Sequence, residues 1–167
     1  MRADSLNVIP RTVSLYDRLY EESIKVFLRI AKQKYSECGG IDTIEMAWLM
    51  GLLESANPLT GYIFVNDKDR KRQYYTESVL SGGNLTKETK KALRYAYGSI
   101  KQYADIVTDA AAMQAYADTG TDFVRWRTAD DEKVCYICNS RDGNVYPLRN
   151  APRKPHYNCR CWLERVR

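Results

Sequence analysis

The cysteines of this chain gather near its C-terminus, and their spacing limits what that part of the chain can fold into. Four of the five cysteines and the single histidine lie between residues 135 and 161. They form a Cys-x2-Cys pair, a gap of 17 residues, a His-x2-Cys pair and one further cysteine. A Cys-x2-Cys pair followed after about 15–20 residues by a second pair is typical of zinc sites. The spacing predicts a small C-terminal β-hairpin module that brings the two pairs together around a metal ion.

Five side chains compete for the four positions of a tetrahedral zinc site. We expect Cys135, Cys138 and Cys159 to bind the ion. His156 is preferred as the fourth ligand because its spacing to Cys159 mirrors that of the first pair. Cys161 stays open as the alternative, since alternate residues of a strand face the same side and Cys159 could share the metal with it. Either set closes the coordination sphere, which favours one structural zinc ion over a catalytic one.

Other uses of the cysteines fit the sequence less well. The N-terminus, MRADSLNVIPRTVS, lacks the apolar segment of a signal peptide, so we expect the chain to stay in a reducing cytoplasm where disulfides are rare. A redox Cys-x2-Cys pair would not need the second cluster. An iron–sulfur cluster would be less natural with a histidine among its ligands.

The positive charge of the chain is concentrated beside the cysteines. Residues 133–167 hold eight Lys or Arg against two acidic side chains, a net of +6, whereas the other 132 residues have a net of −1. A basic segment favours contact with nucleic acid or an acidic protein surface, and we expect Arg149, Arg153 and Lys154 to form that contact surface. The alternative is a solvated surface with no partner.

The rest of the chain has the patterning of a helical body. Apolar residues at helical spacing, together with Gly, Pro and Asn breaks, predict helices over residues 12–37, 41–55, 68–80 and 86–118, with an extended link at 61–66. Asp42 is the expected cap of the second helix, and Asn57-Pro58 its end. No stretch approaches the roughly 20 apolar residues that span a bilayer, so no membrane contact is expected.

Two helices carry apolar faces that predict the core of this body. On the first helix the expected face is Leu15, Leu19, Ile24, Phe27 and Ala31. On the long fourth helix, alternating spacings of three and four predict a heptad-like seam through Leu93, Ala96, Ile100, Tyr103, Val107, Ala110, Gln114 and Ala117. The seam is interpreted as a core stripe that needs a partner helix.

The pattern changes after Gly120, the expected C-cap of the long helix. Residues 122–128 alternate as a strand does, and Asp142-Gly143 is typical of a tight turn. The prediction is therefore a mainly α fold with one long helix: a helical body over residues 1–120 and a zinc-binding β-rich module over 121–167. Trp126 and Trp162 are expected to pack around the metal, because so small a module has little other core.

The C-terminal residues resemble the signature of the phage Mu protein F-like family of minor head, or head morphogenesis, proteins. That signature runs through Trp126 and Thr128, Asp130 or Asp131, Cys135 and Cys138, Asp142-Gly143, Pro155-His156, and Cys159-Arg160-Cys161. Residues 106–120 are similar to the helix that precedes it, and the first 100 residues add little. Many family members carry Arg-Thr-Glu where this chain has Val107-Thr108-Asp109, so no role is transferred to that segment.

The resemblance implies a low-copy component of the virion head, made in the cytoplasm of a bacterial host. Its partners would be the phage portal or the major capsid protein, and in some cases the packaged DNA. The alternative is a small zinc-knuckle regulator that binds nucleic acid, with Tyr136, Tyr146, Tyr157 and Trp162 stacking on bases.

An enzyme is not expected from this sequence. The motifs of phosphate-binding loops, zinc proteases and zinc deaminases are absent, and the only histidine is already assigned to the metal. The acidic run Asp130, Asp131 and Glu132 is interpreted as a solvated turn.

Overall fold

The computed structural model describes residues 3–41, 64–156 and 158–166. The predicted second helix, with its Asp42 cap and its Asn57-Pro58 end, lies outside these residues from residue 42 onward. Tyr157, one of the four aromatic residues expected to stack on bases, also lies outside them.

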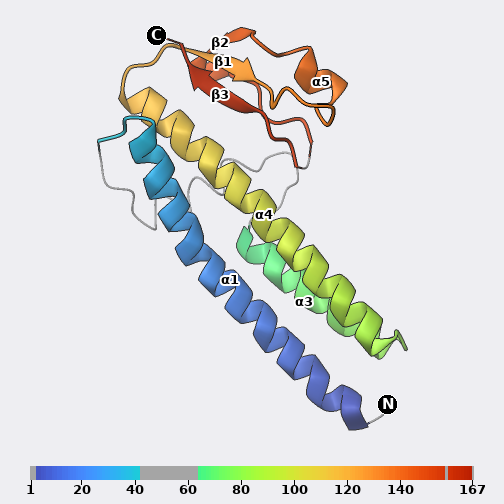
Figure 1. Cartoon of the computed structure of the whole chain (residues 1–167). Coiled ribbons are helices and arrows are strands. Elements are labelled where there is room, and N and C mark those ends of the chain that lie inside the picture. Colours follow the sequence, from blue (N-terminus) through green and yellow to red (C-terminus); the bar gives the residue numbers. More distant parts are fainter. Residues whose placement is uncertain (1–2, 42–63, 157, 167) are drawn as a thin grey trace. The chain divides into compact units, whose positions relative to one another are not determined.

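The described chain is mainly helical, with a small antiparallel sheet near its C-terminus, as the sequence predicted. In chain order the elements are α1 (Ala3–Glu37), α3 (Phe64–Leu80), α4 (Leu85–Asp118), β1 (Phe123–Arg127), α5 (Tyr136–Asn139), β2 (Val145–Pro147), the 3-10 helix η1 (Leu148–Asn150) and β3 (Trp162–Arg165) (Figure 1). They fall into two compact units: the described residues up to Arg29 with those from 64 to Ile106, and the described residues from Ile30 to 41 with those from Val107 onward.

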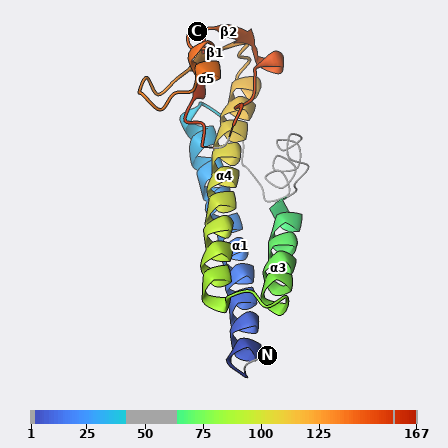
Figure 2. The same ribbon diagram turned by 90° about the vertical axis from the view of Figure 1, so that its right-hand side faces the viewer.

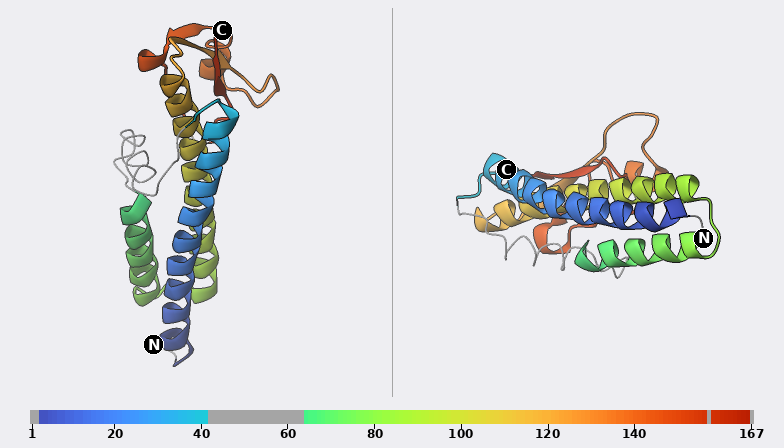
Figure 3. Two further views of the ribbon diagram at one scale, coloured as in Figure 1. Left: turned by 90° about the vertical axis from the view of Figure 1, so that its left-hand side faces the viewer. Right: turned by 90° about the horizontal axis from the view of Figure 1, so that it is seen from below.

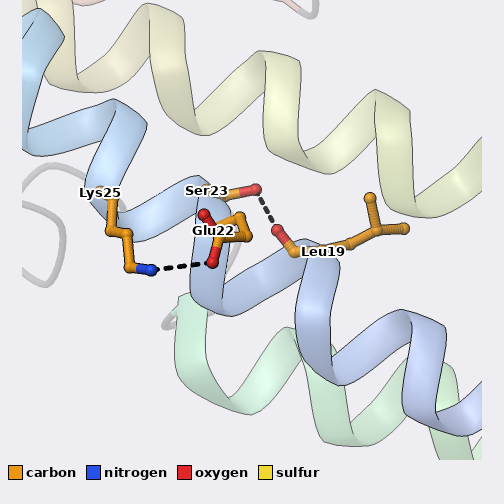
Figure 4. Close-up of polar contacts among 4 residues, drawn as sticks. All are labelled: Leu19, Glu22, Ser23 and Lys25. Carbon is orange, nitrogen blue, oxygen red and sulfur yellow. Dashed lines mark hydrogen bonds and ion pairs between the residues drawn. The ribbon is translucent and has the colours of Figure 1, made fainter.

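The predicted long helix is present as α4, but α1 is longer than predicted and is a second long helix. It begins at Ala3 and continues through Pro10, whose nitrogen cannot donate a helical hydrogen bond. Its buried positions are Thr12, Tyr20, Ser23, Phe27, Ala31 and Tyr35. Phe27 and Ala31 confirm the predicted face, whereas Leu15, Leu19 and Ile24 are only half-buried. Ser23 keeps its hydroxyl inside by donating to the carbonyl of Leu19, and the exposed Lys25 pairs with Glu22 at 2.8 Å (Figure 4).

Helices α3 and α4 form a helical hairpin. Helix α3 starts at Phe64, so residues 64–66 are helical rather than part of an extended link. Asn84 caps α4, with its Oδ1 accepting from the N–H of Lys87 at 2.9 Å. Across the hairpin, the hydroxyls of Tyr75 and Thr89 lie 2.9 Å apart. Figure 2 shows α3 beside the first half of α4, joined to it by a short turn.

The buried stripe of α4 follows the predicted seam in the middle and leaves it at the C-terminal end. Ala96, Tyr103 and Val107 are buried as predicted. From Tyr103 the stripe continues in steps of four through Val107 to Ala111 and Ala115, so Ala110 and Gln114 are half-buried and Ala117 is exposed. A seam with a mean step of 3.5 drifts around a straight helix of 3.6 residues per turn, which is why the heptad pattern fails after four turns.

The end of α4 packs against the sheet within the second unit. Gly120 has a φ of +69° and the N–H of Thr121 donates to the carbonyl of Tyr116 at 2.9 Å, which confirms the predicted C-cap. Tyr116, Ala112 and Val124 form a small apolar cluster. The Tyr116 hydroxyl donates to the carbonyl of Leu163 at 3.4 Å, and burial raises the pKa of Tyr116 to about 12.

The sheet has the order β2-β1-β3, with both neighbours antiparallel to β1. The predicted β-hairpin is therefore not its organising unit. Asp142-Gly143 does make a tight turn, with Gly143 at a φ of +76°, but this turn lies between α5 and β2. The N–H of Gly143 donates to the carbonyl of Trp126 at 2.9 Å. Arg127, the last residue of β1, pairs with Trp162, the first residue of β3.

Candidate metal centre

Two segments that carry the candidate ligands meet beside the end of β1. The first, between β1 and β2, includes α5 and supplies Cys135 and Cys138. The second, between η1 and β3, supplies His156, Cys159 and Cys161. The first segment starts where β1 ends. Because β3 runs antiparallel to β1, the second segment enters β3 beside that same end of β1 (Figure 1). The central strand, rather than a hairpin, thus brings the two halves together.

The five candidates form two overlapping groups that could bind a metal ion. Cys135, Cys138 and His156 form one group, and Cys138, Cys159 and Cys161 the other, with ligand atoms inside each group within 4.8 Å of one another. Cys138 belongs to both. Its Sγ lies 3.4 Å from the Sγ of Cys159 and 3.6 Å from the Nε2 of His156. The same imidazole nitrogen lies 3.0 Å from the Sγ of Cys135.

These distances suit a tetrahedral ion bound by sulfur and nitrogen. With Zn–S bonds of about 2.3 Å, two sulfurs of a tetrahedron lie about 3.8 Å apart. A disulfide is excluded between Cys138 and Cys159, because its sulfurs would be about 2.05 Å apart. All five cysteines of the chain are free thiols. The donor set, thiolates with one imidazole, matches the preference of zinc among biological metals.

The first Cys-x2-Cys pair is shaped by the short helix α5. Cys135 is its N-cap, and the N–H of Cys138 donates to the Sγ of Cys135 at 3.4 Å. This hydrogen bond is the main reason that the pKa of Cys135 falls to about 7, with His156 contributing in the same direction. A thiol with this pKa is about half thiolate at neutral pH, and the thiolate is the form that binds a metal.

The other sulfurs lie in the core of the module. Cys138, Cys159 and Cys161 are buried together with Trp126, which is 1% exposed. Burial raises the pKa of Cys138 and of Cys161, because a thiolate is costly away from water. A metal cation would supply the positive charge that such buried thiolates need.

The two tryptophans do not share the role predicted for them. Trp126 packs on the cysteines as expected, and the guanidinium of Arg141 stacks on its ring at 5.3 Å. Its buried indole nitrogen has no acceptor at ordinary hydrogen-bond distance in the described part of the chain, but it lowers the pKa of Cys161 against the larger effect of burial. Trp162 is 46% exposed, because β3 turns this position away from the cysteines.

Two further residues, Arg160 and Asp131, support the site in a role that the sequence analysis did not assign to them. Arg160, between the last two cysteines, is paired with the carboxylate of Asp131, whose other contact is the N–H of Lys133 at 3.0 Å. This pair lowers the pKa of Asp131. The acidic run is thus a turn that holds the Cys-Arg-Cys segment in place. The sequence contained the signal for this pair: Arg160 stands between two candidate ligands, and Asp131 follows the strand β1.

One of the three residues predicted to form a basic contact surface is paired within the chain. Lys154 forms a 2.8 Å ion pair with Asp109 of α4, within the second unit. Its charge is therefore already neutralised by the chain. Arg149 and Arg153 are exposed, and the carbonyl of Arg153 accepts from Arg141 at 3.2 Å. The contact surface itself stays a prediction.

No family model, curated protein or solved structure matches this chain. The resemblance to the minor head family therefore rests on the C-terminal signature and on residues 106–120, which lead into it. Across the ranges that the structure describes, no helix has a stretch long and apolar enough to cross a bilayer.

Proposed function

We propose that the C-terminal module is a structural zinc knuckle, with Cys135, Cys138, Cys159 and His156 as ligands. The observation that carries this proposal is the position of Cys138, whose sulfur belongs to both metal-competent groups and lies in a buried core. One ion beside Cys138 would join the segment before β2 to the segment before β3. A closed set of four ligands leaves no position for a substrate, which supports a structural rather than a catalytic role.

His156 and Cys161 are distinguished by one pair of variants. His156→Ala is expected to weaken zinc binding about 10- to 100-fold or more, because it removes an exposed ligand without disturbing the buried sulfurs. Cys161→Ser should weaken binding less. Competition with a chromophoric chelator measures both affinities, and the spectrum of the cobalt(II)-substituted protein reports how many thiolates bind. A greater loss in Cys161→Ser, with one thiolate fewer in its cobalt spectrum, would make Cys161 the fourth ligand.

We also propose that the chain is a minor head protein of a phage, associated with the portal or the capsid. The support is that the residues of the family-like signature have structural roles around the same site. Trp126 packs on the cysteines, and Asp131 holds Arg160. Asp142 accepts from the N–H of Thr128 at 2.9 Å through its Oδ1. Because these residues act around one site, their joint resemblance carries more weight than that of any one of them.

The minor head proposal is tested in virions. In Arg149→Gln/Arg153→Gln two exposed positive charges beside the knuckle are lost while the Lys154–Asp109 pair is kept. The amount of this protein in purified heads, or the DNA they retain, is expected to fall several-fold, since a basic surface is drawn to polyanions. Immunoblotting of gradient-purified particles gives the result. Normal heads from this variant would mean that the two arginines only solvate the surface. Absence of the protein from wild-type heads would end the proposal.

The exposed aromatic residues favour a second candidate, a zinc-knuckle regulator that binds nucleic acid. Tyr136 is 86% exposed at the start of α5, and Trp162 is 46% exposed. Side chains of this kind can stack on bases. Binding of free DNA that is lost in Tyr136→Ala/Trp162→Ala, without co-purification with a portal ring, would favour the regulator.

A further inference from the structure

A second basic region lies outside the C-terminal module. Residues 67–101 hold nine Lys or Arg against four acidic side chains, a net of +5, on the α3–α4 hairpin. The near-neutral sum over the first 132 residues hides this region, because residues 102–132 carry seven acids against two arginines. Along the sequence, therefore, an acidic segment separates two basic ones.

The charges on α4 form a stripe along one face. Lys87, Lys90, Lys91, Arg94 and Lys101 recur at helical spacing, on the side opposite to the buried positions Ala92, Ala96, Ser99 and Tyr103. From Lys87 to Lys101 the stripe extends about 21 Å at 1.5 Å per residue. Glu88 is the single acid between Leu85 and Lys101. No carboxylate of the described residues is within ion-pair distance of Lys87, Lys90, Arg94 or Lys101, all of which are exposed.

Exposed tyrosines border the stripe. Tyr74 of α3, Tyr95 and Tyr97 are 53%, 45% and 62% exposed. The ammonium of Lys91 lies 5.4 Å from the ring of Tyr74 and 6.0 Å from that of Tyr95, and it donates to the Tyr74 hydroxyl at 3.3 Å. The guanidinium of Arg94 lies 5.9 Å from the Tyr95 ring. Tyr74 and Tyr95 thus border one edge of the stripe, beside Lys91 and Arg94, and Tyr97, two residues along the helix from Tyr95, borders the other edge (Figure 3 shows the two helices that carry them).

A glycine in the middle of the stripe points to a ligand that approaches the backbone. Gly98 is exposed, and a Cβ at this position would meet nothing within 4 Å. Packing therefore does not require glycine here, although glycine is one of the poorest residues inside a helix. A missing side chain between Arg94 and Lys101 leaves room for a phosphate group beside the helix.

We propose that this face of the α3–α4 hairpin binds single-stranded nucleic acid. The five cations of the stripe would contact consecutive phosphates, and Tyr74, Tyr95 and Tyr97 would stack on unpaired bases. A groove of positive charge beside exposed aromatic rings is how proteins bind single strands without reading their sequence. The inference is independent of the zinc knuckle and of the minor head proposal, since none of these residues lies in the C-terminal module.

The test uses fluorescence anisotropy of the zinc-loaded full chain with a labelled oligo(dT) of about 20 nucleotides, and with a duplex of the same length. Lys90→Gln/Arg94→Gln/Lys101→Gln should bind the single strand at least about tenfold more weakly at low salt. The slope of log K against log salt should fall by about 2, at about 0.7 per lost phosphate contact. Arg18→Gln/Arg29→Gln/Lys32→Gln removes the same charge from exposed positions of α1 and should change the slope little.

Two further variants test the stacking of bases on the tyrosines and the approach of a phosphate to Gly98, separately from the positive charge of the stripe. Tyr95→Leu/Tyr97→Leu should lower affinity for the single strand about fivefold or more with an unchanged salt slope, and leave duplex binding as it was. Gly98→Leu should raise the melting temperature, because leucine is the better helix former, and yet weaken binding. A variant that becomes more stable and binds less cannot have failed to fold.

Several results would overturn the proposal. No measurable binding by the wild type would do so, as would an equal loss in the α1 control, which would indicate attraction by net charge alone. Duplex affinity equal to that for the single strand, unaffected by Tyr95→Leu/Tyr97→Leu, would make the face a duplex-backbone surface. Loss of binding in Arg149→Gln/Arg153→Gln with none in the α4 variant would assign nucleic-acid binding to the C-terminal module instead.

Discussion

Cys138→Ser is expected to abolish zinc binding and to unfold the C-terminal sheet while the long helices remain. Cys138 is the one candidate shared by both metal-competent groups, and it is 1% exposed in the core of the module. Structural zinc contributes about 10–16 kcal/mol to folding in small zinc domains, far more than the core of a module of this size can supply. Removing the shared sulfur should therefore leave the loops before β2 and β3 without the link that orders them.

Elemental analysis and two spectroscopic signals test this expectation. Zinc should fall from about one ion per wild-type chain to none. Far-ultraviolet circular dichroism should keep most of its helical signal, whereas the amide resonances of β1 and β3 should collapse toward random-coil positions.

The matched control is Cys38→Ser, at the end of α1 and outside both groups. It removes one thiol and should keep the zinc. A full zinc content in Cys138→Ser would refute the proposed centre, and no zinc in wild-type protein prepared without chelator would do so directly.

Trp126→Ala is expected to cost about 3–5 kcal/mol of stability in the zinc-loaded protein, as large aromatic truncations in cores do. Its ring is 1% exposed and packs on Cys138, Cys159 and Cys161. The cavity would open beside the sulfurs, so zinc should also dissociate more readily. Denaturant unfolding followed by the resonances of the sheet measures the first effect, and the rate of zinc transfer to a chelator measures the second.

Trp162→Ala is the control for this variant. Trp162 was expected to share the packing, but it is 46% exposed and its truncation should change stability by less than about 1 kcal/mol. Equal destabilisation by the two substitutions would mean that Trp162 covers the centre in solution.

Local features of the sequence determined much of this protein. The spacing of Cys135, Cys138, His156 and Cys159 identified residues that the fold brings together, because a tight turn over two intervening residues aims both ligands at one point. Gly120 ended α4 as predicted, since the C-cap needs only a residue that accepts a positive φ. The helices themselves followed from apolar spacing, although their ends shifted at Ala3 and Phe64.

The tertiary structure decided what depends on partners distant in the chain. Alternating residues predicted a strand at Phe123–Arg127, but nothing local shows that this strand is central and pairs on both sides. Once the heptad seam had drifted around α4, packing in the fold selected Ala111 and Ala115 rather than Ala110 and Gln114 as the buried positions. Lys154 is paired with Asp109, which the fold and not the local sequence places beside it. Spacing along the chain sets which groups can point together, whereas exclusion of water and pairing of charge across the fold set which of them do.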